Sequence, residues 1–119
     1  MTKAILLVSH GSKSPKAKEE ILRLVNVLKR ESGVEAFECA FLEAESPNIP
    51  EGIENCLKKK AKEVVILLNF LNSGQHVNED IPRIVEESKK NHPNVKFHIT
   101  KPLAQHPAII ELFLEMLDM

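Results

Sequence analysis

Two histidines stand just beyond apolar, strand-like runs of this sequence. His10 follows residues 3–9 directly, and His76 follows residues 62–71 after a short connection. In an open α/β sheet, side chains at the carboxyl ends of neighbouring strands converge on one crevice, the usual ligand site of such folds. Two imidazoles at that edge could share one metal ion.

A carboxylate joins the two imidazoles on the same edge. Glu43 ends the strand predicted at residues 34–42, which we expect beside the first strand. Nitrogen and oxygen donors of this kind suit divalent iron, cobalt, nickel or zinc, and without a third histidine coordination positions stay open for a substrate. The three residues therefore predict an open metal site that is suited to chemistry or transfer.

The elements that must position these side chains alternate from one end of the chain to the other. Apolar runs and helical spacing predict strands at 3–9, 34–42, 62–71 and 95–100 and helices at 15–31, 49–60, 78–91 and 107–117. Strands separated by helices require right-handed crossovers and hence a mostly parallel sheet that is covered on both faces. We expect a flavodoxin-like three-layer α/β/α fold with four parallel strands in the order 2-1-3-4.

The expected helix boundaries rest on capping residues. Ser14, Asn48 and Asn78 are predicted N-caps, and Gly33 is predicted to end the first helix. The lysines at 58–60 would complement the negative end of the second helix dipole.

Composition places the chain in a broad class. Its 119 residues suit one domain, 1–119, and 16 basic against 17 acidic residues give no general attraction to nucleic acid or membranes. The first apolar run is too short for a signal peptide or a membrane helix. Cys39 and Cys56 lack ligand-type spacing, so we expect buried thiols in a cytoplasmic protein.

The other three histidines have weaker claims to a functional role. His92 precedes the fourth strand and therefore falls on the opposite, amino edge, where we expect solvent exposure. His98 lies within that strand and is expected to be packed or exposed on a face. His106 follows the strand on the correct edge, and Pro107 indicates that it mainly begins the last helix, which makes it a peripheral pocket candidate.

Three segments of the chain resemble a known family. LLVSHGSKS, AFLEAESPNIPEGIENC and FLNSGQHVNEDIP are similar to the small class II tetrapyrrole chelatases, the sirohydrochlorin chelatases of the CbiX type. The Gly-x-His-Val-x-Glu-Asp-Ile-Pro block is the most specific part, because it joins a glycine turn, a candidate ligand and a helix start at fixed spacing. Leu68-Asn69-Phe70-Leu71 departs from the Pro-Leu-Phe-Leu usual in the family.

The resemblance implies a reaction and a set of roles. His10 and His76 match the metal-binding and catalytic histidines, and Glu43 matches a catalytic acidic residue. The neighbouring residues would bind the tetrapyrrole: Gly11, Ser12, Lys13, Ser73, Gly74 and Gln75. The reaction would insert divalent cobalt, iron or possibly nickel, as a substrate, into a sirohydrochlorin-like tetrapyrrole for cobalamin or sirohaem-type biosynthesis, with no organic cofactor.

The resemblance also implies a homodimer, because this length corresponds to half of the two-domain scaffold of longer chelatases. The tetrapyrrole would then bind in a cleft where two subunits face each other.

Two alternatives from other classes stay open. A non-catalytic metal or tetrapyrrole carrier would share His10 and His76 but would bind without turnover. A phosphate-handling flavodoxin-like enzyme would use the Gly11-Ser12 turn and the start of the first helix as an anion cradle. The chain has no P-loop and no Arg before His10, and bound phosphate would leave His76 without a role.

Overall fold

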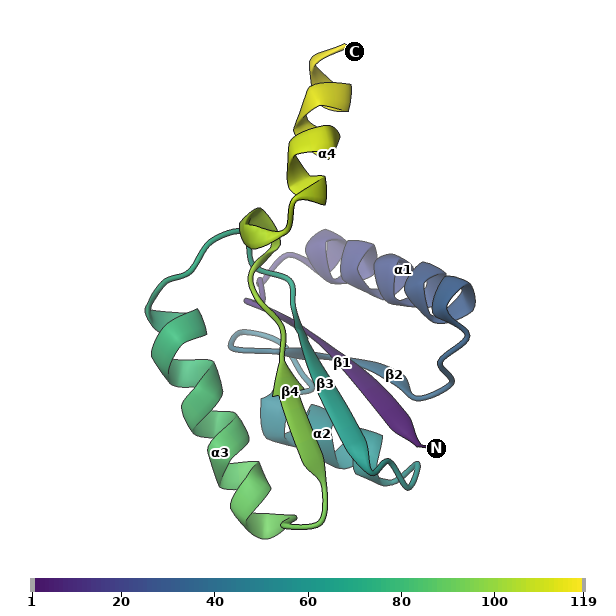
Figure 1. The fold of residues 1–119 in the computed structure, drawn as a ribbon, viewed down its shortest axis with the longest axis vertical. Helices are drawn as coiled ribbons and strands as arrows, with labels where there is room; N and C mark the ends of the chain where they lie inside the picture. Colours follow the sequence, from purple (N-terminus) through teal and green to yellow (C-terminus); the bar gives the residue numbers. More distant parts are fainter. Residues whose placement is uncertain (1, 119) are drawn as a thin grey trace.

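The computed structural model describes residues 2–118 and has the predicted alternation of strands and helices. The elements are β1 (Lys3–Ser9), α1 (Pro15–Ser32), β2 (Phe37–Phe41), α2 (Ile49–Leu57), β3 (Glu63–Leu68), the π-helical segment η1 (His76–Asp80), α3 (Ile81–Asn91), β4 (Lys96–Ile99), the 3₁₀ segment η2 (Leu103–Gln105) and α4 (Ala108–Leu117). The strands are all parallel and ordered β2-β1-β3-β4 (Figure 1), which confirms the predicted topology.

Apolar side chains fill both faces of the sheet. On one face Leu6 of β1 and Ile66 of β3 are fully buried in the core beneath α2 and α3. On the other face Val25 of α1 packs with Leu7 and Phe37. Burial on both faces explains why the strands are nearly continuous apolar runs rather than alternating ones.

Three predicted elements extend three residues too far at one end. The strand predicted at 34–42 covers only Phe37–Phe41, and the long strand predicted at 62–71 ends at Leu68. The helix predicted to residue 60 ends at Leu57, because the next residues turn and Lys60 has a φ of 63° that no helix residue adopts. For the strands, the apolar runs did not distinguish the strand residues from the apolar loop residues beside them.

The predicted start of the third helix is also wrong. Asn78 does not cap it but lies inside η1, where its backbone N–H donates to the carbonyl oxygen of Gly74 at 2.8 Å. The α-helix begins at Ile81, with Pro82 in its first turn as expected. The π-helical turn moves His76 from a loop onto the start of a helical segment, which fixes its backbone.

Two of the other predicted caps are confirmed. The Asn48 side-chain oxygen accepts a hydrogen bond from the Glu51 backbone N–H, and the Glu51 carboxylate accepts one from the Asn48 backbone N–H, both at 2.9 Å. Gly33 ends α1 with a left-handed φ of 72°. Ser14 precedes α1 as predicted, but its side chain makes no cap bond. Instead its backbone N–H donates to the Ser12 hydroxyl at 3.0 Å.

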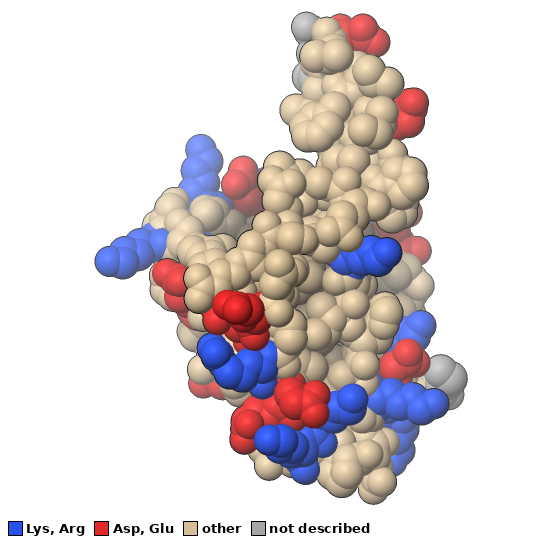
Figure 2. Space-filling model, turned by 60° about the vertical axis from the view of Figure 1, so that its left-hand side comes forward, with Lys and Arg blue, Asp and Glu red and all other residues tan. Residues whose placement is uncertain are grey.

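The last helix stands apart from the rest of the molecule. Figure 1 shows α4 projecting beyond the carboxyl edge of the sheet, and it contributes to the long dimension of a body that measures 47 × 32 × 30 Å. Its apolar side chains are exposed, Leu117 to 77%. The space-filling view in Figure 2 shows the same helix as a mainly uncharged projection. Within residues 2–118, no helix is both long and apolar enough to cross a membrane.

Candidate metal centre

The site lies where the first and third strands end side by side. The backbone N–H of Asn69, just after β3, donates to the carbonyl of Val8 in β1 at 2.9 Å. Its side-chain amide donates to the buried Ser9 hydroxyl at 3.0 Å. These two bonds hold together the strand ends that precede His10 and the loop to His76.

A glycine brings His10 close to Glu43. The backbone N–H of Glu43 donates to the His10 carbonyl at 3.0 Å. Gly11 has a φ of 104°, and a Cβ built on it would lie 1.8 Å from the Glu43 carbonyl oxygen. Any other residue would therefore push the two loops apart, so the His-Gly pair is needed to bring an imidazole and a carboxylate to one point.

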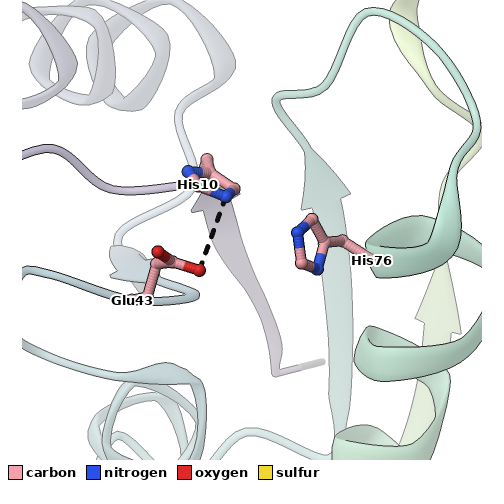
Figure 3. A group of neighbouring side chains, drawn as sticks. All are labelled: His10, Glu43 and His76. Carbon is pink, nitrogen blue, oxygen red and sulfur yellow. Dashed lines mark ion pairs between the residues drawn. The ribbon is translucent and has the colours of Figure 1, made fainter.

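The three predicted side chains converge. His10 Nε2 lies 3.6 Å from Glu43 Oε1, and the centroids of the two imidazole rings are 5.2 Å apart. One donor atom from each residue falls within 4.8 Å of the others. Figure 3 shows the three side chains arriving from separate elements, with a nitrogen of His76 facing His10 and Glu43. Donors this close around an open space can bind one ion.

A second carboxylate fixes the orientation of His76. Nδ1 of its ring lies 2.8 Å from Asp80 Oδ2, and Arg83 donates to Asp80 Oδ1 at 3.2 Å. An ionised carboxylate can only accept hydrogen bonds, so Nδ1 carries the hydrogen and Nε2 of the neutral ring keeps its lone pair. Nε2 is the nitrogen turned toward the other donors, an arrangement that orients many metal-binding histidines.

The site is open to solvent. About half of each donor side chain is exposed, 50% for His10, 59% for Glu43 and 46% for His76. The Asp80 side chain is less exposed, at 22%. A large planar ligand can therefore approach the donors from outside, whereas Asp80 stays behind them.

The structure places the predicted tetrapyrrole-binding residues around this edge. Lys13, Ser73, Gly74 and Gln75 are exposed, and Gly11 and Ser12 are half-buried. The Ser73 hydroxyl accepts a bond from the Gln105 side chain at 3.0 Å, which ties its loop to η2. A Cβ on Gly74 would contact nothing and its φ is not left-handed, so the predicted glycine turn does not require glycine.

The remaining histidines lie outside the cluster. His92 is at the amino edge as predicted, but it is half-buried and its Nε2 lies 2.8 Å from Glu54 Oε2, so it joins α3 to α2. His98 is exposed on β4. His106 Nδ1 accepts a bond from the Ala108 backbone at 3.0 Å, which confirms that it begins the last helix.

Both cysteines are free thiols on the elements predicted for them. Cys56 is buried in α2, and burial, with a smaller contribution from Glu38, raises its pKa to about 12. Cys39 in β2 is only half-buried, in contrast to the prediction, and burial raises its pKa as well. Thiols with raised pKa values are poor nucleophiles and poor metal ligands, so neither competes with the histidine cluster.

Sequence reasoning missed two residues that build the site. Asp80 lies four residues after His76, the spacing that brings side chains together on a helix, so the pattern could have revealed the pair. Asn69 gave no such signal, because its partner Ser9 is sixty positions away.

Together, the sheet order and the His-Glu-His cluster at the carboxyl edge define an α/β/α protein with an open candidate metal centre. The CbiX family model matches residues 4–118, and the chain belongs to the CbiX family. A sirohydrochlorin cobaltochelatase from Priestia megaterium is 31% identical over 111 residues, which are 92% of this chain and 36% of the relative. A sirohydrochlorin cobaltochelatase from Methanocaldococcus jannaschii is 32% identical over 89 residues, 75% of this chain and 62% of the relative.

Solved structures agree with this assignment. The sirohydrochlorin chelatase SirB from Bacillus subtilis subspecies spizizenii, in complex with cobalt, superposes with a TM-score of 0.89 at 28% identity, over 100% of this chain and 51% of that one. A CbiX protein from Marinobacter aquaeolei has the same fold, with a TM-score of 0.77 over 98% of both chains at 22% identity. The chain spans about a third to a half of the length of the sirohydrochlorin chelatases from Priestia megaterium, Arabidopsis thaliana and Bacillus subtilis that it matches.

Proposed function

We propose that this protein is a sirohydrochlorin chelatase, which inserts a divalent metal into a tetrapyrrole. The observation that carries the proposal is the convergence of His10, Glu43 and His76 within 4.8 Å at an exposed sheet edge. The names of the relatives support it, since they include both sirohydrochlorin cobaltochelatases and ferrochelatases. Cobalt and iron are therefore the first metals to test, with nickel as a third.

The proposed chemistry divides metal delivery from proton removal. Insertion replaces two pyrrole N–H protons by one divalent ion, so the ion must shed water and two protons must leave the ring. In this scheme Nε2 of His76 and a nitrogen of His10 hold the ion on one face. Glu43, or a histidine that has released its metal, accepts protons.

Local positive charge would help to hold the carboxylates of the tetrapyrrole. The chain is nearly neutral overall, with a formal charge of −1, so the attraction must be local. Lys13 and Lys16 are exposed beside His10 at the start of α1, whose N-terminal dipole also favours anions.

The proposal includes a cytoplasmic homodimer. A homodimer would supply the second wall of a tetrapyrrole cleft, since the exposed donor atoms of one chain have open space in front of them. Free thiols at Cys39 and Cys56 support a reducing compartment.

Metal insertion can be measured by the absorbance change of sirohydrochlorin under anaerobic conditions with Co²⁺, Fe²⁺ or Ni²⁺. We expect many turnovers per protein molecule with at least one of these metals. A rate equal to the uncatalysed rate with all three metals would contradict the proposal.

The same assay tests the two alternatives. A carrier would bind metal or tetrapyrrole in stoichiometric amounts and would leave the insertion rate unchanged. A phosphate-handling enzyme is less well supported, because the Ser12 hydroxyl already bonds to the Ser14 backbone and Pro15 offers no N–H for an anion. Saturable binding of inorganic phosphate with no metal insertion would favour it.

A further inference from the structure

The loop between β2 and α2, residues 42–48, carries Glu43, and its backbone is held mainly on one side. We call it the Glu43 loop. The backbone N–H groups of Leu42 and Glu43 donate to the carbonyls of Ser9 and His10 at 2.9 and 3.0 Å. Within the described part of the chain, the three residues after Glu43 take part in no backbone–backbone hydrogen bond. The far side of the loop therefore depends on other contacts for its position.

The residue after Glu43 adopts a backbone conformation that it does not favour. Ala44 has a φ of 66°, in the left-handed region where the Cβ of any residue but glycine is crowded. Such a residue persists only where the surrounding structure holds it, and such residues gather at functional sites. Relaxation of Ala44 would move the neighbouring Glu43, so a contact on the far side of the loop must oppose it.

Lys18 of α1 supplies that contact. Its ammonium donates to the backbone carbonyl of Ser46 at 3.0 Å and lies 3.2 Å from Glu45 Oε1. The ammonium also lies 5.9 Å from the ring centroid of Phe41, the last residue of β2. Among residues 2–118, these are the only side-chain hydrogen bonds and ion pairs that join α1 to the Glu43 loop.

The place of Lys18 in its helix is unfavourable for a lysine that has no such role. It lies in the first turn of α1, where the helix dipole favours anions, and that turn has no acidic residue. Its side chain is only 33% exposed, although lysine side chains normally extend into water. The contacts with the Glu43 loop explain why a cation lies here.

Apolar packing does not hold the loop against α1. A cavity of about 200 Å³ lies between the first turns of α1 and the ends of β1 and β2, with Gly11, Ile21 and Phe41 among its lining residues. Protein interiors are normally close-packed, so a gap here leaves the loop without side-chain support on this side. The polar contacts of Lys18 bridge the gap.

We propose that Lys18 is a positioning residue that holds the Glu43 loop, so that the Glu43 carboxylate stays beside His10 (Figure 3). The bond to the Ser46 carbonyl is the essential one, because that carbonyl belongs to the loop backbone. The Glu45 carboxylate is on a side chain that can rotate away without moving the loop. The inference rests on the role of Glu43 in the proposed function, and the hold on the loop can be measured without the reaction.

Amide hydrogen exchange, followed by NMR on the full chain, tests this hold directly. Lys18→Met removes the ammonium and keeps the apolar stem, so the Glu43 amide should exchange roughly tenfold faster. Lys18→Arg keeps the charge and the N–H donors and should stay close to the parent. Lys29→Met, at the exposed far end of α1, is the matched control and should leave the Glu43 amide unchanged. The amide of Leu6 in the buried strand β1 should be unaffected in every variant.

Two exchange results would overturn the inference. An unchanged Glu43 amide in Lys18→Met would mean that Lys18 does not hold the loop. Equal acceleration of the Glu43 and Leu6 amides would mean that Lys18 only stabilises the whole fold. Circular dichroism and urea unfolding check that the variants are folded. If Lys18→Met is unfolded, Lys18→Gln takes its place, because it keeps a polar side chain that is too short to reach the Ser46 carbonyl.

Kinetics of metal insertion then test the consequence for the reaction. Misplacement of Glu43 should lower kcat in Lys18→Met roughly 10–100-fold, with KM for the tetrapyrrole nearly unchanged, and Lys18→Arg should restore most of the rate. A parental kcat despite faster exchange would refute the positioning role. A raised KM with a parental kcat would make Lys18 a substrate-binding residue instead. If the parent chain itself inserts no metal, the proposed function fails, whereas the exchange experiment still decides whether Lys18 holds the loop.

Discussion

His76 and His92 are both paired with a carboxylate at 2.8 Å, yet they lie at opposite edges of one sheet and have different surroundings. At the amino edge, His92 joins two helices through Glu54, and no second histidine stands opposite it within the described chain. At the carboxyl edge, Asp80 occupies one nitrogen of His76 and leaves the other facing His10 and Glu43. A His-carboxylate pair becomes a candidate metal centre only where further donors converge on the free nitrogen.

The largest expected effect is the loss of either histidine of the cluster. His10→Ala and His76→Ala should each abolish nearly all metal insertion, because the one remaining histidine cannot hold the ion on one face of the ring. The fold should persist, since both side chains are half exposed at the sheet edge. Insertion rates and circular dichroism measure the two properties separately. His98→Ala, at an exposed strand position, is the control, and near-parental rates in either cluster variant would contradict the shared site.

The next effect concerns Glu43, the carboxylate that faces the histidines at the carboxyl edge and has no counterpart near His92. If Glu43 alone accepts the pyrrole protons, Glu43→Gln should lower turnover by roughly 10²–10⁴-fold while metal binding changes little. Single-turnover rates measure the effect on turnover, and Co²⁺ titrations measure the effect on metal binding. Glu45→Gln makes the same change of charge in the same loop, where Glu45 contacts Lys18, and should leave the rate nearly intact. A large loss of Co²⁺ affinity would make Glu43 a ligand instead.

A smaller effect is expected from the carboxylate behind His76. Asp80→Asn removes the acceptor charge that holds Nδ1–H and should weaken metal binding about 10–100-fold. Because the tautomer of a ligand is altered, the visible absorption spectrum of bound Co²⁺ should also change. Glu79→Gln, at the exposed neighbouring position, should alter neither property. An unchanged Co²⁺ spectrum in Asp80→Asn would limit Asp80 to a purely structural role.

The sequence was sufficient for the sheet order and for the convergence of His10, Glu43 and His76, because these follow from strand ends in a parallel sheet. It did not predict the π-helical start at His76, since the pattern of residues 76–80 fits an α-helix equally well. The half-exposure of Cys39 and the projection of α4 depend on which faces are covered. Tertiary packing determines which faces are covered, and the local sequence pattern does not indicate it.

Acidification tests whether the histidines of the cluster bind the metal. Histidine is the side chain whose charge changes between pH 5 and 8, and a protonated imidazole cannot bind metal. Insertion should therefore fall as the pH is lowered, by up to about tenfold per pH unit for each ligand that is protonated, and added metal should restore it. A loss of insertion activity at low pH that excess metal does not reverse would indicate an effect on proton transfer rather than on metal binding.

The smallest effect belongs to the amino edge. His92→Ala removes the link from α3 to Glu54 of α2, but the carboxylate is 57% exposed and water can replace its partner. Unfolding in urea should therefore show a loss of less than about 1 kcal/mol. Insertion and Co²⁺ affinity should match those of the parent, because His92 lies at the edge opposite the cluster. A tenfold fall in insertion without a matching loss of stability would mean that the two edges are coupled, and the difference between the two histidines would no longer rest on the local donors alone.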